Sequence, residues 1–573
     1  MADRGDGHGG PRRVRVLPST PPVTAAGGTP HRGITRRDFL NGVLIGASGL
    51  AASRVLGACS NGGETTPGTD AGVPPMGEDL RELLDTCHAL RDGQSFQLPA
   101  ASGNLYDCII VGTGISGLTA AWRLGKLGVT NFLMLEKEPV LGGVARAGTD
   151  GAQVFAQGAA YTVQPFNQEL IDLYTDLGVI TGLDGQGLPI IDPKYEVKAP
   201  PNNVYLNGQW YENAWDEGMQ NLPLAPQALQ DLLACRAKID ELYNYVGADG
   251  ALAFDCPSDA STTDAAIRAL DTVSFQQWVS DNGWDPAVTQ FFNRYCASAM
   301  GSTPEALSAW GMLNFLGSEF YPVMTQPGGN ACWAKMLADK VGAAKIKLSS
   351  FVLRVIEEAG EVHVSYLDNG TPVTMRAKTA IYAAPRHMVH YLIPGLAAAN
   401  RNDYTEFHYS PYLLVNVHVS KTPAGLAYDN WVHDPCYFTD FILADWAGLS
   451  DPAHAPLDRP NVLTIYTPLL GPNDRADMLT QPFEFYEQKV LPDLERVLPG
   501  VTSTITAIDL FRWGHPIVIA GPNFIFGTAR EGAQAPLGNI SFAGADLDGL
   551  PAFENAVAAA YRAADEVHTI IIA

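Results

Sequence analysis

The chain has 573 residues, of which 46% are hydrophobic and 17% are charged, and its formal net charge is −24. This composition excludes a disordered or fibrous protein, and the length predicts several domains or one large two-lobed unit. The acidic balance argues against nucleic acid as a partner, and the sequence has no run of eighteen uninterrupted apolar residues, which excludes a polytopic membrane protein.

The N-terminal segment has the opposite charge to the rest of the chain. Residues 1–59 hold eight Arg against three Asp, which leaves 29 basic and 58 acidic residues, a net charge of −29, in the remainder. Within this segment Arg36-Arg37 is followed by Phe39-Leu40 and by a weakly apolar, Gly- and Ala-rich stretch to residue 56. The pattern resembles a twin-arginine export signal, which implies export to the periplasm or cell envelope. The alternative is a chance Arg pair before a buried helix.

A lipid anchor and a tether are predicted next. The sequence Leu-Gly-Ala-Cys over 56–59 resembles a lipobox, so that a lipidated Cys59 would be the only contact with the membrane. Ordinary cleavage nearby is the alternative. The Gly-, Thr- and Pro-rich residues that follow predict a flexible tether, with its boundaries at 60–84.

A dinucleotide-binding fingerprint follows the tether. Residues 107–111 predict a buried parallel strand that leads into a GxGxxG turn and a helix. A second strand over 132–135 ends in an acidic residue, nineteen positions after the last glycine, which is the spacing for contact with a ribose. The residues predicted to bind here are Gly112, Gly114, Ile115, Ser116, Gly117 and Glu136.

The residues after Glu136 indicate which dinucleotide binds. Lys137, the pair Gly142-Gly143 and Arg146 resemble the second glycine motif of the FAD-binding flavoproteins that include amine oxidases, phytoene desaturases and protoporphyrinogen oxidases. The resemblance implies FAD, with these residues against its diphosphate. The usual GGR is GGV here, with the Arg displaced to position 146.

The C-terminal residues resemble the closing motif of the same family. A strand over 540–543 ends in Gly544 and Asp546, and a long helix follows. The resemblance implies that the acid bonds the flavin ribityl chain and that the helix N-terminus, at Pro551 and Ala552, faces the flavin, where its dipole stabilises negative charge. The other positions that the resemblance assigns to FAD are Val352, beside adenine, and Gln157, Gly158 and Ala159, beside the flavin ring.

The fold class predicted is α/β, with a Rossmann-type FAD-binding domain interleaved with an α+β substrate domain. The predicted FAD-binding segments are 85–165, 326–395 and 511–573, and the substrate domain comprises 166–325 and 396–510. Within them we expect helices to begin at Ser274, Thr303 and Asn330, and a hairpin to turn at residues 368–370.

Three short motifs narrow the resemblance. They are the predicted export signal, residues 88–93 and residues Arg512–Pro516. Together they resemble exported, bacterial spermidine dehydrogenase-type members of the amine oxidase superfamily. The resemblance implies oxidation of an amine C–N bond by hydride transfer to flavin N5, hydrolysis of the resulting imine, and reoxidation by O2 or an electron-transport partner. It also allows haem b, with Cys87 and His88 as the candidate ligand pair; the alternative is that His88 is a histidine that binds no metal, and no other metal is expected.

The candidate catalytic residues are His515 and Tyr161. The acidic body favours encounter with a polycationic amine. Two other functions stay open: a flavin desaturase or dehydrogenase for a carotenoid- or porphyrinogen-like substrate, and a non-catalytic or electron-carrying envelope flavoprotein. The aromatic residues predicted in the substrate lobe, most of them as core, are Trp310, Phe315, Tyr321, Tyr412, Trp431, Tyr437, Phe438 and Trp446.

Overall fold

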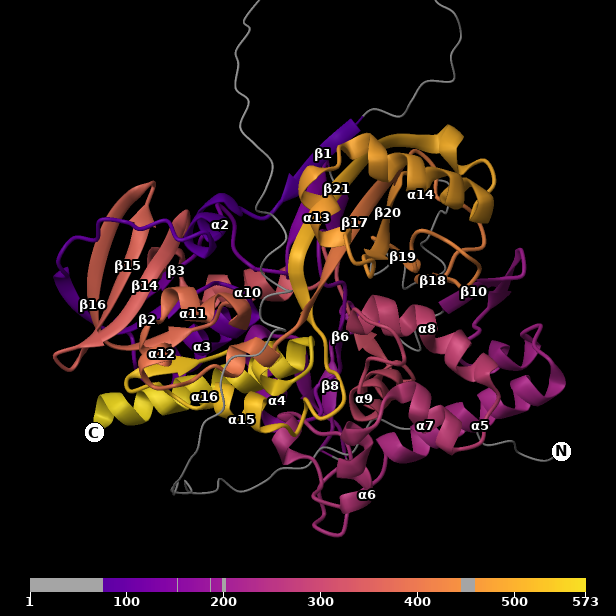
Figure 1. Cartoon of the computed structure of the whole chain (residues 1–573). Coiled ribbons are helices and arrows are strands. Elements are labelled where there is room, and N and C mark those ends of the chain that lie inside the picture. Colours follow the sequence, from indigo (N-terminus) through magenta and orange to yellow (C-terminus); the bar gives the residue numbers. More distant parts are fainter. Residues whose placement is uncertain (1–75, 152, 186, 198–201, 445–458) are drawn as a thin grey trace, which may run out of the picture. The chain divides into compact units, whose positions relative to one another are not determined.

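The computed structural model describes residues 76–573, except 152, 186, 198–201 and 445–458 (Figure 1). The predicted export signal, Cys59, most of the predicted tether and Trp446 lie outside the described residues. No helix among the described residues is long and apolar enough to cross a bilayer.

The first of two large sheets carries the dinucleotide fingerprint. Its strand order is β13-β3-β2-β16-β15-β14, and β22 pairs with β16. The parallel strands are β2 (Ser102–Val111), β3 (Phe132–Leu135), β13 (Ile346–Lys347), β16 (Thr371–Tyr382) and β22 (Ile540–Phe542). The antiparallel strands are β14 (Ser350–Glu358) and β15 (Glu361–Asp368).

Helices cover this sheet, which explains why its central strands are apolar on both faces. Residues 108–111 of β2 are buried, as expected of a parallel strand inside an α/β domain. The covering helices are α3 (Ile115–Lys126), α10 (Ala331–Val341) and α16 (Phe553–Ile572), and α3 packs against both others. Figure 1 shows α3 and α16 beside β2. The predicted Rossmann-type fold class is confirmed.

The second large sheet has the strand order β1-β21-β17-β20-β19-β18-β10-β11. The bounds of its strands are β1 (Met76–Arg81), β10 (Asn202–Leu206), β11 (Gln209–Glu212), β17 (Tyr409–Val419), β18 (Asp429–Val432), β19 (Asp440–Leu443), β20 (Asn461–Pro468) and β21 (Ile505–Val518). Because these strands come from three distant parts of the chain, the sheet is discontinuous in sequence.

The remaining elements are short strands and helices. The strands are β4 (Ala147–Asp150), β5 (Gln153–Ala156), β6 (Thr162–Val163), β7 (Ile180–Leu183), β8 (Pro189–Ile191), β9 (Glu196–Val197) and β12 (Val323–Met324). The helices are α2 (Asp85–Arg91), α4 (Gln168–Leu177), α5 (Pro226–Tyr243), α6 (Ala265–Arg268), α7 (Phe275–Asp281), α8 (Pro286–Met300), α9 (Ala309–Ser318), α11 (Val389–Leu392), α12 (Gly395–Ala398), α13 (Asp474–Thr480), α14 (Phe483–Val497) and α15 (Thr528–Gln534).

Local signals predicted several of these elements correctly. Ser274 caps α7 by accepting a bond from the Gln277 backbone, and α10 begins directly after Asn330. The turn between β15 and β16 uses Asn369 and Gly370, both at positive φ.

Three predictions of local structure differ from the structure. Residues 76–81 of the predicted tether form β1, because Asp79 makes a two-bond ion pair with Arg512, at 2.7 Å each, and fixes the strand beside β21. β21 runs unbroken to Val518 in the second sheet, past the predicted boundary at 511. The helix predicted from Thr303 begins only at Ala309, after the side chain of Ser308 caps it.

Candidate functional site

The first glycine turn lies between β2 and α3. Gly112 has a φ of +100°, and a Cβ on Gly117 would lie 2.1 Å from the Gly112 carbonyl oxygen. Gly114 is the N-cap of α3 and offers no side chain to cap it. The helix N-terminus, which carries Ile115 and Ser116, therefore presents backbone N–H groups to an anion.

Glu136 lies at the carboxyl end of β3, beside this turn. It is 5% exposed, and its Oε2 accepts bonds from the Thr113 backbone N–H at 2.9 Å and the Thr113 hydroxyl at 2.7 Å. The Glu136 carbonyl accepts from the Ser350 backbone at 2.7 Å, two residues before Val352 on β14. The predicted ribose and adenine contacts therefore lie at the same edge of the sheet.

The second glycine pair approaches the first turn closely. Gly142 and Gly143 have φ of +112° and +58°, and a Cβ on Gly143 would lie 3.2 Å from the Gly114 Cα. Arg146 stacks on the Phe511 ring, its guanidinium carbon 4.8 Å from the ring centroid. The small residues at these positions leave room for a diphosphate.

Lys137 and Arg146 also bind acidic side chains of the chain itself. Lys137 pairs with Glu82 and with Glu138, both at 3.1 Å, and Arg146 lies 3.6 Å from Glu138. Lys137 thus joins the segment after β1 to the edge of the cofactor site. Its assignment to FAD stays a prediction.

The C-terminal motif meets the same edge of the sheet. Asp546 follows Gly544 after β22 and accepts bonds from the Tyr409 hydroxyl and the Arg386 backbone. The N-cap of α16, Ala552, follows Pro551 and provides no side-chain cap. Two uncapped helix N-termini, glycines that allow close approach and a buried acid fit a dinucleotide with a diphosphate and a ribityl chain.

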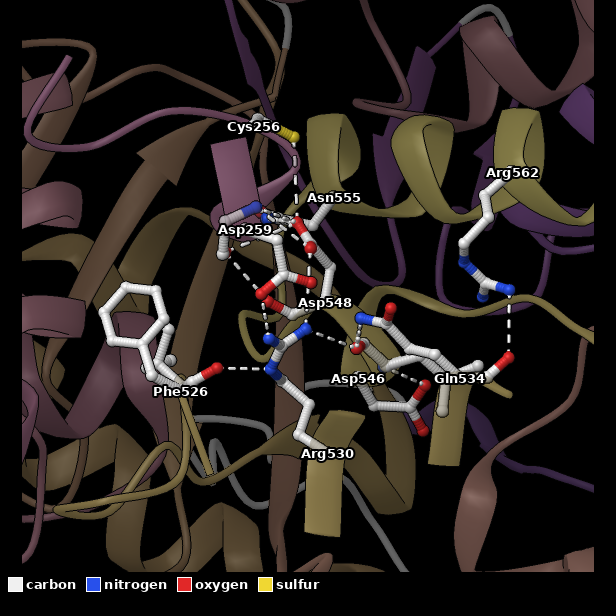
Figure 2. Close-up of polar contacts among 12 residues, drawn as sticks. Cys256, Asp259, Phe526, Arg530, Gln534, Asp546, Asp548, Asn555 and Arg562 are labelled. Carbon is white, nitrogen blue, oxygen red and sulfur yellow. Dashed lines mark hydrogen bonds and ion pairs between the residues drawn. The ribbon is translucent and has the colours of Figure 1, made fainter. Parts of the chain in front are cut away.

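A buried ionic network holds this motif in place (Figure 2). Arg530 binds Asp259 and lies 4.0 Å from Asp548, and both Arg530 and Asp548 are almost fully buried. Asp548 accepts bonds from the Ser258 backbone at 3.0 Å and from the Asn555 amide on α16. The network ties the start of α16 to the segment that precedes α6.

The segment Gln157–Ala159 is fixed between the second sheet and α10. The Trp513 indole N–H donates to the Gln157 carbonyl at 2.7 Å, and the Tyr466 hydroxyl donates to the Gly158 carbonyl at 3.3 Å. The Ala159 carbonyl accepts from the Asn330 backbone at 2.9 Å.

An aromatic pocket opens beside this segment. Its lining residues are Tyr161, Asn202, Trp215, Tyr295, Glu319, Val323, Tyr428, Asp429 and Trp431. Glu319 accepts bonds at one oxygen from the hydroxyls of Tyr161, at 2.7 Å, and Tyr295, at 3.0 Å. Burial raises the pKa of Glu319, and the two hydroxyl bonds oppose that rise.

Two further carboxylates lie at and behind the wall of this pocket. Asp429 lines it, Asp440 is its neighbour on the next strand, and the two side chains are 7% and 3% exposed. Burial first, and then the charge of Asp440, raises the pKa of Asp429 well above its usual range. Burial likewise raises the pKa of Asp440 to about 7.

The structure separates the two predicted catalytic residues. Tyr161 lines the pocket, whereas His515 stacks on His387 with ring centroids 4.2 Å apart, close to the Tyr409 that binds Asp546. Burial lowers the pKa of His515 and brings that of His387 to about 3, which favours the neutral form of both rings. His515 therefore belongs to the cofactor side.

The haem hypothesis keeps one candidate ligand. The Cys87 thiol donates to the Leu83 carbonyl at 3.9 Å, and burial raises its pKa, which disfavours the thiolate that iron would need. His88 lies on the same short helix, α2, with a partly exposed side chain. Haem at His88 stays a prediction.

Several residues of the pocket were not predicted from sequence. Of the aromatic residues predicted in the substrate lobe, Trp431 lines the pocket. The missed lining residues are Asn202, Trp215, Tyr295, Glu319, Val323, Tyr428 and Asp429. Asp440, on the strand next to Asp429, was missed as well. The sequence offers one signal that could have found them, an Asp inside an apolar strand pattern, as at 438–443. An Asp is rarely buried without a partner, so such a position indicates a functional or paired carboxylate.

Comparisons with known proteins agree with this geometry. The family model for flavin containing amine oxidoreductase matches residues 115–568. Oxidoreductase PigB of a Serratia species is 24% identical over 82% of this chain and 78% of its own length. Putrescine oxidase of Kocuria rosea is 25% identical over 55% of this chain and 65% of its own length. The structure of cyclohexylamine oxidase from Brevibacterium oxydans is 19% identical and has a TM-score of 0.59, covering 81% of this chain and 99% of the other. The chain therefore belongs to the family of flavin-containing amine oxidoreductases, and its cofactor is FAD.

Proposed function

We propose that this enzyme oxidises a diamine or polyamine at a C–N bond. The observation that carries the proposal is the pairing of two carboxylates, Glu319 and Asp429, with aromatic rings in one pocket. Buried negative charge is costly unless it is paired, and a substrate with two cationic nitrogens supplies one partner for Glu319 and one for the site at Asp429. The Kocuria relative, named putrescine oxidase, is consistent with such a substrate.

The aromatic residues suit the carbon chain as well as the cations. Trp215 packs against Tyr295 and Trp431, with ring centroids 5.1 and 5.3 Å apart. Such faces attract ammonium groups and cover methylene groups. The pocket would orient the carbon next to the reacting nitrogen and exclude water, and FAD held at the two glycine turns would supply the hydride acceptor.

We also propose that the enzyme acts in the cell envelope. The support is the pair Arg36-Arg37 before a Gly- and Ala-rich stretch, and Cys59 within a lipobox-like sequence. Fractionation of cells that express the wild type, Arg36→Lys/Arg37→Lys and Cys59→Ala tests this proposal. We expect the double variant to stay in the cytoplasm and Cys59→Ala to lose membrane attachment; a wild type confined to the cytoplasm contradicts export.

Anaerobic mixing with a substrate panel tests the activity. We expect putrescine and spermidine to bleach the flavin bands at lower concentrations than cyclohexylamine does. Glu319→Gln should weaken diamine binding by about 1.5–3 kcal/mol, or roughly ten- to a hundredfold, because one charge-assisted contact is lost. The exposed Glu241→Gln on α5 is the matched control and should leave binding unchanged.

Other outcomes identify the other functions. Bleaching only by an isoprenoid or porphyrinogen indicates the desaturase class. Reduction only by a protein or quinol partner indicates an electron carrier. Equal response to diamines and monoamines removes the case for two cationic nitrogens.

A further inference from the structure

The neighbouring acids Asp429 and Asp440 lie on one face of the second sheet. Asp440 pairs with Trp431 across β18 and β19 and with Tyr466 across β19 and β20, while Asp429 pairs with Ile442. Residues paired across strands share a face, and Asp429 lies two positions before Trp431, so the two carboxylates are diagonal neighbours. Tyr466 lies on the same face, and its hydroxyl donates a hydrogen bond to the Gly158 carbonyl, beside the predicted flavin position.

Each of the two acids has an oxygen without a partner. Oδ1 of Asp429 and Oδ1 of Asp440 are buried and accept no hydrogen bond from any described residue. A buried carboxylate oxygen without a partner is costly in the ionised form, so such an oxygen favours a protonated carboxyl group or a further hydrogen-bond donor. Asp429 lines the pocket, and Asp440 lies behind it.

The charges around the pair favour one shared proton. Two adjacent buried carboxylates do not both ionise readily, because each negative charge disfavours the other. The charged or polar groups that influence the pair come from α8, the end of α9, β17, β20 and the residues directly before β6, β18 and β19. They are Tyr161, Arg294, Tyr295, Ser298, Glu319, Tyr412, Tyr428, Thr439 and Tyr466. Glu319 raises the pKa of Asp440, whereas Arg294 lowers it.

We propose that Asp429 and Asp440 form a proton relay that deprotonates the substrate ammonium before its oxidation. An N–H bond of the ammonium breaks, and its proton forms an O–H bond on Asp429 while Asp429 passes its own proton to the Asp440 carboxylate. The nitrogen keeps the electron pair of the broken bond. One positive and one negative charge disappear together, and the neutral amine can then lose a hydride. Asp429 is thus a catalytic residue, and Asp440 is a positioning residue that acts through it.

This inference rests on the proposed amine oxidation, and the pH profile of flavin reduction tests it. The assay measures the limiting rate of anaerobic flavin reduction at saturating putrescine between pH 6 and pH 10. The wild-type rate should fall below about pH 7, where Asp440 becomes protonated. In Asp440→Asn, we expect a rate at least tenfold lower at pH 7.5 that rises about tenfold per pH unit, because only substrate already deprotonated in solution then reacts, and that fraction grows about tenfold per pH unit below the amine pKa. Asp440→Glu should restore the wild-type profile.

A second variant covers the case in which Asp440→Asn loses FAD. Glu319→Gln removes a negative charge that raises the pKa of Asp440, so its acid limb should move to lower pH. A profile of Asp440→Asn that superimposes on the wild type overturns the relay, as does an unmoved limb in Glu319→Gln. If no amine reduces the wild-type flavin at any pH, the proposed function itself fails.

Discussion

Two glycines of the first turn should respond differently to the same substitution. Alanine at position 117 places its Cβ 2.1 Å from the Gly112 carbonyl oxygen, so backbone atoms must shift by about 1 Å to reach an ordinary contact. Overpacking of this kind costs about 1–3 kcal/mol. Among the described residues, the atom nearest to a Cβ on Gly114 is the Gly142 oxygen at 4.0 Å, and the φ of −65° there suits alanine. Its cost to the fold should be about 0.5–1 kcal/mol, because alanine is a poorer N-cap than glycine.

Gly114→Ala, although the milder substitution for stability, should weaken the binding of FAD. A methyl group there occupies the space through which the diphosphate approaches the N-terminus of α3. Loss of one charge-assisted bond of about 1.5–3 kcal/mol raises the dissociation constant of FAD roughly ten- to a hundredfold. The assays are urea denaturation of the deflavinated protein and titration of FAD fluorescence. The reasoning is refuted if Gly114→Ala destabilises the apoprotein as much as Gly117→Ala, or if it binds FAD as the wild type does.

Three further predictions concern the N-terminal segment, the pocket and haem. Asp79→Asn should lower the free energy of unfolding by about 1–3 kcal/mol, measured in urea, because Arg512 keeps a buried charge without its ion pair; an unchanged midpoint contradicts a structural role for β1. Tyr161→Phe removes the bond to Glu319 and should raise the KM for putrescine about two- to tenfold with little change in kcat; a loss confined to kcat would place Tyr161 in the chemical step instead. A Soret band that disappears in His88→Ala would support haem, whereas flavin bands alone in the wild type exclude it.

The sequence was sufficient wherever a short stretch of chain determines its own structure. Gly112 and Gly117 predicted the turn because the positive φ of Gly112, and the 2.1 Å that would separate a Cβ on Gly117 from the Gly112 carbonyl oxygen, exclude a side chain there. Asn369-Gly370 and Ser274 predicted a hairpin and a helix start for the same local reason. The spacing to Glu136 also sufficed, because adjacent parallel strands end at one edge of a sheet.

The tertiary structure decided what the pocket contains. Tyr161, Glu319 and Asp429 are separated by more than a hundred residues each, and the pairing of β10 with β18 and the packing of α8 and α9 bring them together. Likewise, pairing with β21 and the ion pair between Asp79 and Arg512 make residues 76–81 a strand where composition predicted a tether. Periodicity and motifs indicate the backbone conformation that a short segment prefers. Which buried charges meet depends on strand order and register, and these are set by long-range packing that no local pattern encodes.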